Sequence, residues 1–111
     1  MNAGDKQVRG STIEAIQLAV ADLFGLSVEE LRQSSTRRTM AVPRQIAIYL
    51  AKQMTDASLP EIGRCFGGKH HTTVMHSIAK IDEQRRTDAA MNKTVETLLD
   101  TLLQSRVREQ R

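Results

Sequence analysis

Three Ser-x-x-Glu sequences, each followed by aliphatic residues, limit the folds that this chain can adopt. They begin at Ser11, Ser27 and Ser58. In such a capping box the serine side chain accepts a hydrogen bond from the backbone of the glutamate, and the glutamate side chain accepts one from the backbone of the serine. Because this exchange satisfies the first N–H groups of a helix, the sequence predicts helix starts at these three positions.

The spacing of aliphatic residues extends this interpretation over most of the chain. Gly25 closes the first helix, and Pro43 fits the first turn of another helix because its missing N–H costs nothing there. Two further helices are predicted over residues 70–88 and 89–107. Residues 32–39, "RQSSTRRT", are polar, basic and without periodicity, and we expect a loop. No segment alternates as a strand does, so the predicted fold class is all-α, with about six helices.

The core of such a fold must be aliphatic, because only 3% of the residues are aromatic. The single cysteine, Cys65, excludes an intramolecular disulfide, and we expect it to be a small buried hydrophobic residue. Residues 1–10 read as a flexible tail or linker remnant without the apolar stretch of a signal peptide, and residues 11–111 as one domain. No apolar run approaches the roughly 20 residues of a membrane span. We therefore expect a cytoplasmic protein.

Each longer helix has one predicted buried face. On the helix after Pro43, the residues Arg44, Gln45 and Lys52 fall away from that face and are expected to reach solvent or a ligand. The expected buried positions are Ile46, Ala47, Leu50, Met54, Val74, Ile78, Ile81, Met91, Val95, Leu98, Leu99 and Leu102. An apolar stripe on a small domain favours packing of the last helix against the rest.

Positive charge is concentrated in the middle of the sequence. Residues 32–80 hold eight Lys or Arg against Asp56 and Glu61, a net charge of +6, whereas residues 1–31 have a net charge of −3 and residues 81–111 are balanced. Such segregation favours a polyanionic partner.

The sequence "GGKHHTTVMH", residues 67–76, lies within this basic block. A short helix that ends at glycine and a longer helix that begins with polar residues form the pattern of a helix-turn-helix. Threonine offers a methyl group to thymine and a hydroxyl for hydrogen bonds, and histidine can donate to guanine acceptors. The N-terminus of the second helix also favours phosphate. The pattern favours a helix that reads DNA in the major groove.

Other interpretations of this motif are weaker. His70, His71 and His76 are poorly aligned for a shared metal, and no acidic residue or cysteine lies between residues 69 and 80. The glycines lack the spacing of a phosphate-binding loop and follow a helix rather than a strand. Ser77 or Cys65 as a nucleophile lacks an orienting acid nearby. We expect no catalytic residue, metal or cofactor, while histidines exposed without any role stay an alternative.

Residues 43–81, "PRQIAIYLAKQMTDASLPEIGRCFGGKHHTTVMHSIAKI", resemble the C-terminal DNA-binding domain, domain IV, of the bacterial replication initiator DnaA. The "PRQ" helix start, the "SLPEIG" segment and the "GG-basic-x-HTTV-x-H" element occur in the order and spacing of that family. The resemblance is strong over residues 41–81 and weaker but consistent over residues 12–38 and 82–103. It implies a helix-turn-helix of Trp-repressor-like architecture. The AAA+ module of the family, with its ATP and Mg²⁺, has no counterpart here, so we expect a fragment or a stand-alone relative.

The resemblance also implies roles for particular residues. Base contacts in the major groove fall on His71 and Thr72. Thr73 falls on a position that contacts a thymine methyl group or the backbone, whereas His76 is expected to be structural. The family arginine that enters the minor groove aligns with Thr36, and we expect Arg37 or Arg38 to take its place. The implied phosphate-contacting positions are Arg44, Gln45, Lys52, Leu59, Pro60, Lys69, His70 and Lys80. Many relatives have aspartate where this chain has His70, which exchanges an acceptor for a donor.

The partner implied by the family is double-stranded DNA carrying a DnaA box, TTATNCACA in consensus, and the isolated domain is expected to be a nucleoid-associated monomer. Replication-regulatory proteins are further implied partners. The alternatives are a stand-alone transcriptional regulator or transposon-associated protein that reads another sequence, and a helical protein-interaction module.

Overall fold

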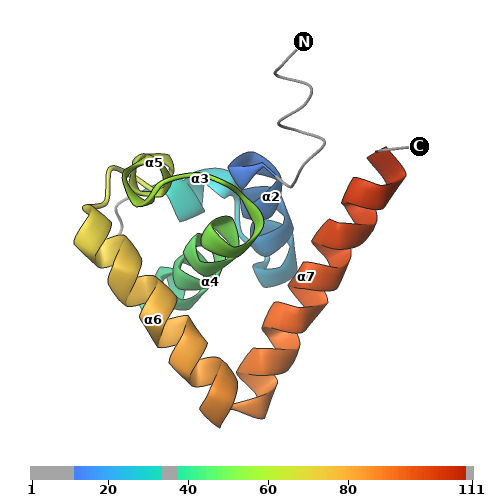
Figure 1. Ribbon diagram of the computed structural model, residues 1–111. Coiled ribbons are helices and arrows are strands. Elements are labelled where there is room, and N and C mark those ends of the chain that lie inside the picture. Colours follow the sequence, from blue (N-terminus) through green and yellow to red (C-terminus); the bar gives the residue numbers. More distant parts are fainter. Residues whose placement is uncertain (1–11, 34–37, 110–111) are drawn as a thin grey trace.

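The computed structural model describes residues 12–33 and 38–109, and within these ranges the chain forms six helices and no strand (Figure 1). The helices are α2 (Ile13–Phe24), α3 (Val28–Arg32), α4 (Arg38–Met54), α5 (Leu59–Cys65), α6 (His71–Thr87) and α7 (Ala89–Glu109). The all-α prediction is confirmed. The tail predicted over residues 1–10 lies outside the described residues.

Two of the three predicted capping boxes begin helices as expected. The Ser27 hydroxyl accepts from the Glu30 N–H at 3.1 Å, and the Glu30 carboxylate accepts from the Ser27 N–H at 2.8 Å. Ser58 and Glu61 make the same pair of hydrogen bonds at 3.2 and 2.8 Å. These two boxes fix the starts of α3 and α5.

The third predicted start, at Ser11, is wrong by one residue. Thr12 is the N-cap of α2, and its hydroxyl accepts from the Ala15 N–H at 3.0 Å. Because two consecutive residues carry hydroxyl groups, the Ser-x-x-Glu pattern alone did not distinguish between them. Gly25 ends the helix as predicted, with a left-handed φ of 67°.

Helix α4 begins earlier than the sequence predicted. Its first residue is Arg38, so the last residues of the expected loop are helical and Pro43 lies inside the helix rather than in its first turn. Met40 is buried in the added turn, which explains why the helix extends over a polar and basic stretch. Pro43 removes one backbone hydrogen bond, to the Thr39 carbonyl. Burial of apolar side chains outweighs that loss.

Helix α4 is also the centre of the fold (Figure 1). It packs against α2, α3, α5 and α6, and its residues 46–51 are all buried. The predicted positions Ile46, Ala47 and Leu50 are confirmed, and Ile48 and Tyr49 are buried beside them. A helix with neighbours on most sides buries most of its circumference.

Helices α6 and α7 meet in a V that encloses α4 and α2 (Figure 1). Val95 and Leu98 of α7 are buried, as predicted, against α6 and α2. Arg85 of α6 links this helix to α4 and α7. Its guanidinium donates to the Tyr49 hydroxyl at 2.9 Å and to the Asn92 side chain at 2.8 Å. The expectation that the last helix packs on the domain is confirmed.

The remaining predicted core positions fall into two groups. Val74, Ile81 and Leu102 are buried, and the half-buried residues, which pack against the edge of the core, are Met54, Ile78, Met91 and Leu99. No helix in the described part of the chain is long and apolar enough to cross a membrane.

The prediction for Cys65 is wrong, because its side chain is exposed. The neighbouring Phe66 is fully buried and takes the core position at the end of α5. The Cys65 carbonyl accepts from the buried Gln17 side chain at 2.9 Å, which links α2 to α5.

Candidate nucleic-acid interface

Two consecutive glycines make the turn between α5 and α6. Gly67 and Gly68 have φ values of 84° and 73°, which residues other than glycine rarely adopt. After this reversal the Lys69 N–H donates back to the Gly63 carbonyl at 2.9 Å, and the Phe66 N–H donates to the same carbonyl at 3.1 Å. The turn therefore holds the start of α6 against α5.

Gly63 permits the close approach of these two helices, a role that the sequence did not reveal. A Cβ atom at this position would overlap the carbonyl oxygen of Lys69 and lie 3.2 Å from its carbonyl carbon. The side chain of Val74 would be 3.5 Å away. The only available signal was a glycine inside a short predicted helix, where glycine is normally unfavourable.

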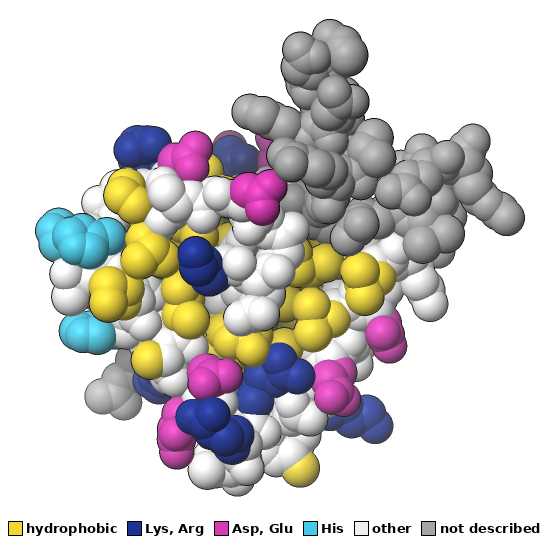
Figure 2. Space-filling model, in the orientation of Figure 1, with side chains coloured by type: hydrophobic (Ala, Val, Ile, Leu, Met, Phe, Trp, Pro, Cys, Tyr) yellow, Lys and Arg dark blue, Asp and Glu magenta, His cyan; other side chains and the backbone are white. Residues whose placement is uncertain are grey.

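The first turn of α6 presents the predicted base-contacting residues together. His71, Thr72 and Thr73 are consecutive and exposed, while the next residue, Val74, is fully buried and anchors the helix. Figure 2 shows histidine side chains at one edge of the molecule, over the start of α6. His76 is exposed as well, which contradicts the structural role predicted for it.

His70 caps α6, and its Nδ1 atom accepts from the Thr72 N–H at 3.1 Å. This corrects the expectation that histidine brings only a donor to a position where many relatives carry an acceptor. A backbone N–H can only donate, so Nδ1 carries a lone pair and the neutral ring holds its proton on Nε2. His70 thus offers an acceptor to the helix and a donor on the other side of the ring.

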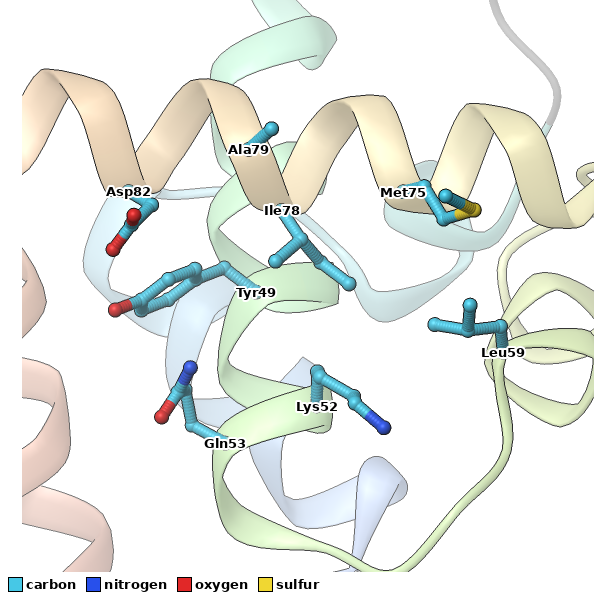
Figure 3. A pocket seen from close by; sticks show the side chains of 8 residues that line it. All are labelled: Tyr49, Lys52, Gln53, Leu59, Met75, Ile78, Ala79 and Asp82. Carbon is cyan, nitrogen blue, oxygen red and sulfur yellow. The ribbon is translucent and has the colours of Figure 1, made fainter.

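Several of the expected phosphate-contacting residues surround the start and middle of α6. Lys52 of α4 and Leu59 of α5 border one hollow of about 440 Å³ together with Met75 of α6, as Figure 3 shows. Lys52 is exposed and Met75 is 50% exposed. Pro60 and Lys80 are exposed too, whereas Lys69 is half-buried. Lys52 of α4 is the cation that lines this hollow, and α6 contributes Met75, Ile78, Ala79 and Asp82 to it.

Arg44 does not reach solvent as predicted. Only 6% of it is exposed, and its Nε donates to the Leu31 carbonyl at 3.2 Å. Burial lowers the pKa of the Arg44 guanidinium. The hydrogen bond from Arg44 to Leu31 joins α4 to α3, so Arg44 has a structural role. Gln45 is half-buried and lies next to it.

The predicted minor-groove residues cannot be placed in the same way. Arg37, with Thr36 before it, lies outside the described residues. The backbone of Arg38 begins α4, and its side chain is not among those described. Across residues 12–33 and 38–105, no group of three or more His, Cys, Asp or Glu side chains is arranged to hold a metal ion.

A family model described as "Bacterial dnaA protein helix-turn-helix" matches residues 13–81, which include α2 to α5 and the first two-thirds of α6. The chain belongs to this family. The resemblance noted in the sequence is thereby confirmed, and the matched residues include α5, the turn at Gly67-Gly68 and the start of α6.

The relatives found by sequence are replication initiators. The chain is 43% identical over 98 residues to the chromosomal replication initiator protein DnaA of Geotalea daltonii, covering 88% of this chain and 22% of that protein. It is 52% identical over 87 residues to the DnaA of Lactobacillus acidophilus, covering 78% and 19%. For Burkholderia multivorans the identity is 45% over 96 residues, covering 86% and 18%. The chain thus spans about a fifth of the length of these relatives.

Proposed function

We propose that the chain recognises DnaA boxes in double-stranded DNA and thereby marks sites of replication initiation. The observation that carries the proposal is the exposed run His71, Thr72 and Thr73 on the first turn of α6, held outward by buried Val74 and by the glycine turn. The N-terminal residues of the second helix of a helix-turn-helix contact base edges in the major groove.

The three exposed side chains supply different contacts. The His71 ring can donate to the acceptors of guanine, and the two threonines offer hydroxyl groups and methyl groups, the latter suited to the thymine methyl. Arg37 or Arg38 would enter the adjacent minor groove, where an arginine reads groove width more than base identity.

Phosphate contacts would fix the register of α6 in the groove. Lys52 and Leu59 line the hollow beside Met75 of α6, and Pro60, the next residue after Leu59, is exposed. The remaining proposed phosphate contacts are Gln45, Lys69, Lys80 and the Nε2–H of His70. Such contacts set orientation and overall affinity but carry no sequence information. Arg44 is buried and is not among them.

The two classes of contact predict different losses on substitution. Thr72→Ala should remove roughly 1–3 kcal/mol of discrimination at one base pair and leave binding to unrelated duplexes unchanged. Lys52→Ala should weaken binding to all duplexes and reduce the slope of log affinity against log salt by about one unit. Both are measured by fluorescence anisotropy on a labelled box and a scrambled duplex. An equal loss on both duplexes for Thr72→Ala would show that Thr72 does not read a base.

Selection from random duplexes tests the identity of the box. Recovery of TTATNCACA-like sequences supports an origin-binding domain. Recovery of an unrelated sequence would instead assign the chain to a regulator that carries the same fold.

A further inference from the structure

Two donors of Thr72 converge on one nitrogen of His70. The Thr72 backbone N–H lies 3.1 Å from His70 Nδ1, and the Thr72 hydroxyl oxygen lies 3.0 Å from the same atom. The His70 ring also packs against the His71 ring, with centroids 4.2 Å apart and planes inclined by 33°. His70 therefore contacts His71 and Thr72, two of the three residues that the proposed function assigns to base reading.

This geometry fixes the direction of the Thr72 hydroxyl hydrogen. Nδ1 is unprotonated because it accepts from a backbone N–H, which can only donate. At 3.0 Å from an unprotonated nitrogen, the hydroxyl group is the donor, and the Thr72 N–H and the Thr72 hydroxyl share the single lone pair of Nδ1. A threonine hydroxyl has a single hydrogen. Once that hydrogen points to His70, only the oxygen lone pairs of Thr72 face solvent or DNA.

We infer that His70 is a specificity-determining positioning residue that acts through Thr72. It turns the Thr72 hydroxyl into a pure acceptor, and an acceptor selects bases that present an exocyclic amino group in the major groove, namely adenine or cytosine. Guanine and thymine present acceptors at the corresponding edges and are disfavoured. The inference rests on the proposed function, since it assumes that Thr72 faces base edges.

Two substitutions at position 70 separate this role from the others that the ring can play. In His70→Asn the amide oxygen remains an acceptor at a favourable capping residue. In His70→Phe a ring that can pack on His71 remains, but no acceptor does. Both variants lose the Nε2–H donor, so a phosphate contact from that atom disappears equally from both and cancels in their comparison.

Thr72→Val first identifies the base pair at which discrimination depends on the Thr72 hydroxyl. The experiment then measures the affinities of the chain for four duplex boxes that differ only at that base pair. The unsubstituted chain and His70→Asn should prefer adenine or cytosine over guanine or thymine by roughly 2- to 10-fold, the range of one hydrogen bond. His70→Phe should bind all four boxes within about 2-fold of one another. In a Thr72→Val background, His70→Phe should cause no further loss of preference, as a double-mutant cycle for a residue acting through Thr72 requires.

Three results would overturn the inference. The first is a full base preference retained in His70→Phe, and the second is a base preference lost equally in His70→Asn. The third is a further loss of base preference caused by His70→Phe in the Thr72→Val background. If His70→Phe does not fold, as judged by circular dichroism, His70→Ala, which likewise lacks an acceptor at this position, takes its place in the same comparison. Failure of the proposed function looks different. In that case the unsubstituted chain binds a box and a scrambled duplex equally, which overturns both proposals at once.

Discussion

Replacement of Gly63 by alanine tests the packing that holds α6 in place. In a helix without neighbours, Gly→Ala stabilises by roughly 0.5–1 kcal/mol, because alanine loses less backbone entropy on folding. Here the new Cβ would overlap the carbonyl oxygen of Lys69. Because this oxygen belongs to the main chain, the backbone at Lys69 would have to shift. Overpacking of this kind costs about 1–3 kcal/mol, and weakening of the hydrogen bond from Lys69 to Gly63 adds about 0.5–1.5 kcal/mol. The sign therefore reverses, and we predict a net destabilisation of about 0.5–4 kcal/mol.

Urea denaturation followed by far-ultraviolet circular dichroism measures this change. Gly25→Ala is the matched control, since Gly25 has a positive φ, a Cβ atom there would meet nothing within 4 Å, and strain alone costs roughly 1–2 kcal/mol. The two variants should lose similar stability, but only Gly63→Ala should lose preference for a box over a scrambled duplex. A Gly63→Ala protein more stable than the parent would refute the close approach of α5 and the turn.

Two further substitutions test how the helices are started and joined. Ser58→Ala removes the hydroxyl that caps α5 and should cost about 0.5–2 kcal/mol in urea denaturation, and no change would mean that the capping box is not formed in solution. Leu98→Ala should cost about 2–5 kcal/mol because Leu98 is buried between α7 and its neighbours, whereas Leu103→Ala, at a position 44% exposed, should change stability by less than about 0.5 kcal/mol. Equal effects of the two leucine substitutions would contradict the packing of α7.

Features set by residues close in sequence could be predicted. The capping boxes at Ser27 and Ser58 depend on groups three residues apart, and both formed as expected. The buried line of α7 likewise follows from helical spacing, so Val95 and Leu98 were identified correctly. In each case the contact or the face is encoded within one or two turns of helix.

Features set by distant neighbours could not be predicted in this way. Arg44 is buried because α3 places the Leu31 carbonyl within reach of its guanidinium. Cys65 is exposed, whereas the next residue, Phe66, is fully buried in the core. Gly63 matters because the chain returns six residues later and its carbonyl meets the α5 backbone. Helical periodicity carries no information on any of these three contacts.

The candidate site was predicted in location more than in detail. The sequence predicted base contacts at His71, Thr72 and Thr73 and a phosphate contact at His70, and the structure exposes all four side chains. The part played by His70 was missed, because the residue type suggested a donor, whereas the position of the Thr72 N–H makes Nδ1 an acceptor. Hydrogen-bond direction is decided by the partner atoms, which only the fold supplies.

A titration at several salt concentrations decides whether this helix-turn-helix reads a DnaA box. A labelled duplex with the box and a scrambled duplex of equal length are titrated with the chain at several salt concentrations. Specific binding should exceed non-specific binding by roughly 10³-fold or more at moderate salt, and both affinities should fall as salt rises. Equal affinities for the two duplexes at every salt concentration would contradict the claim.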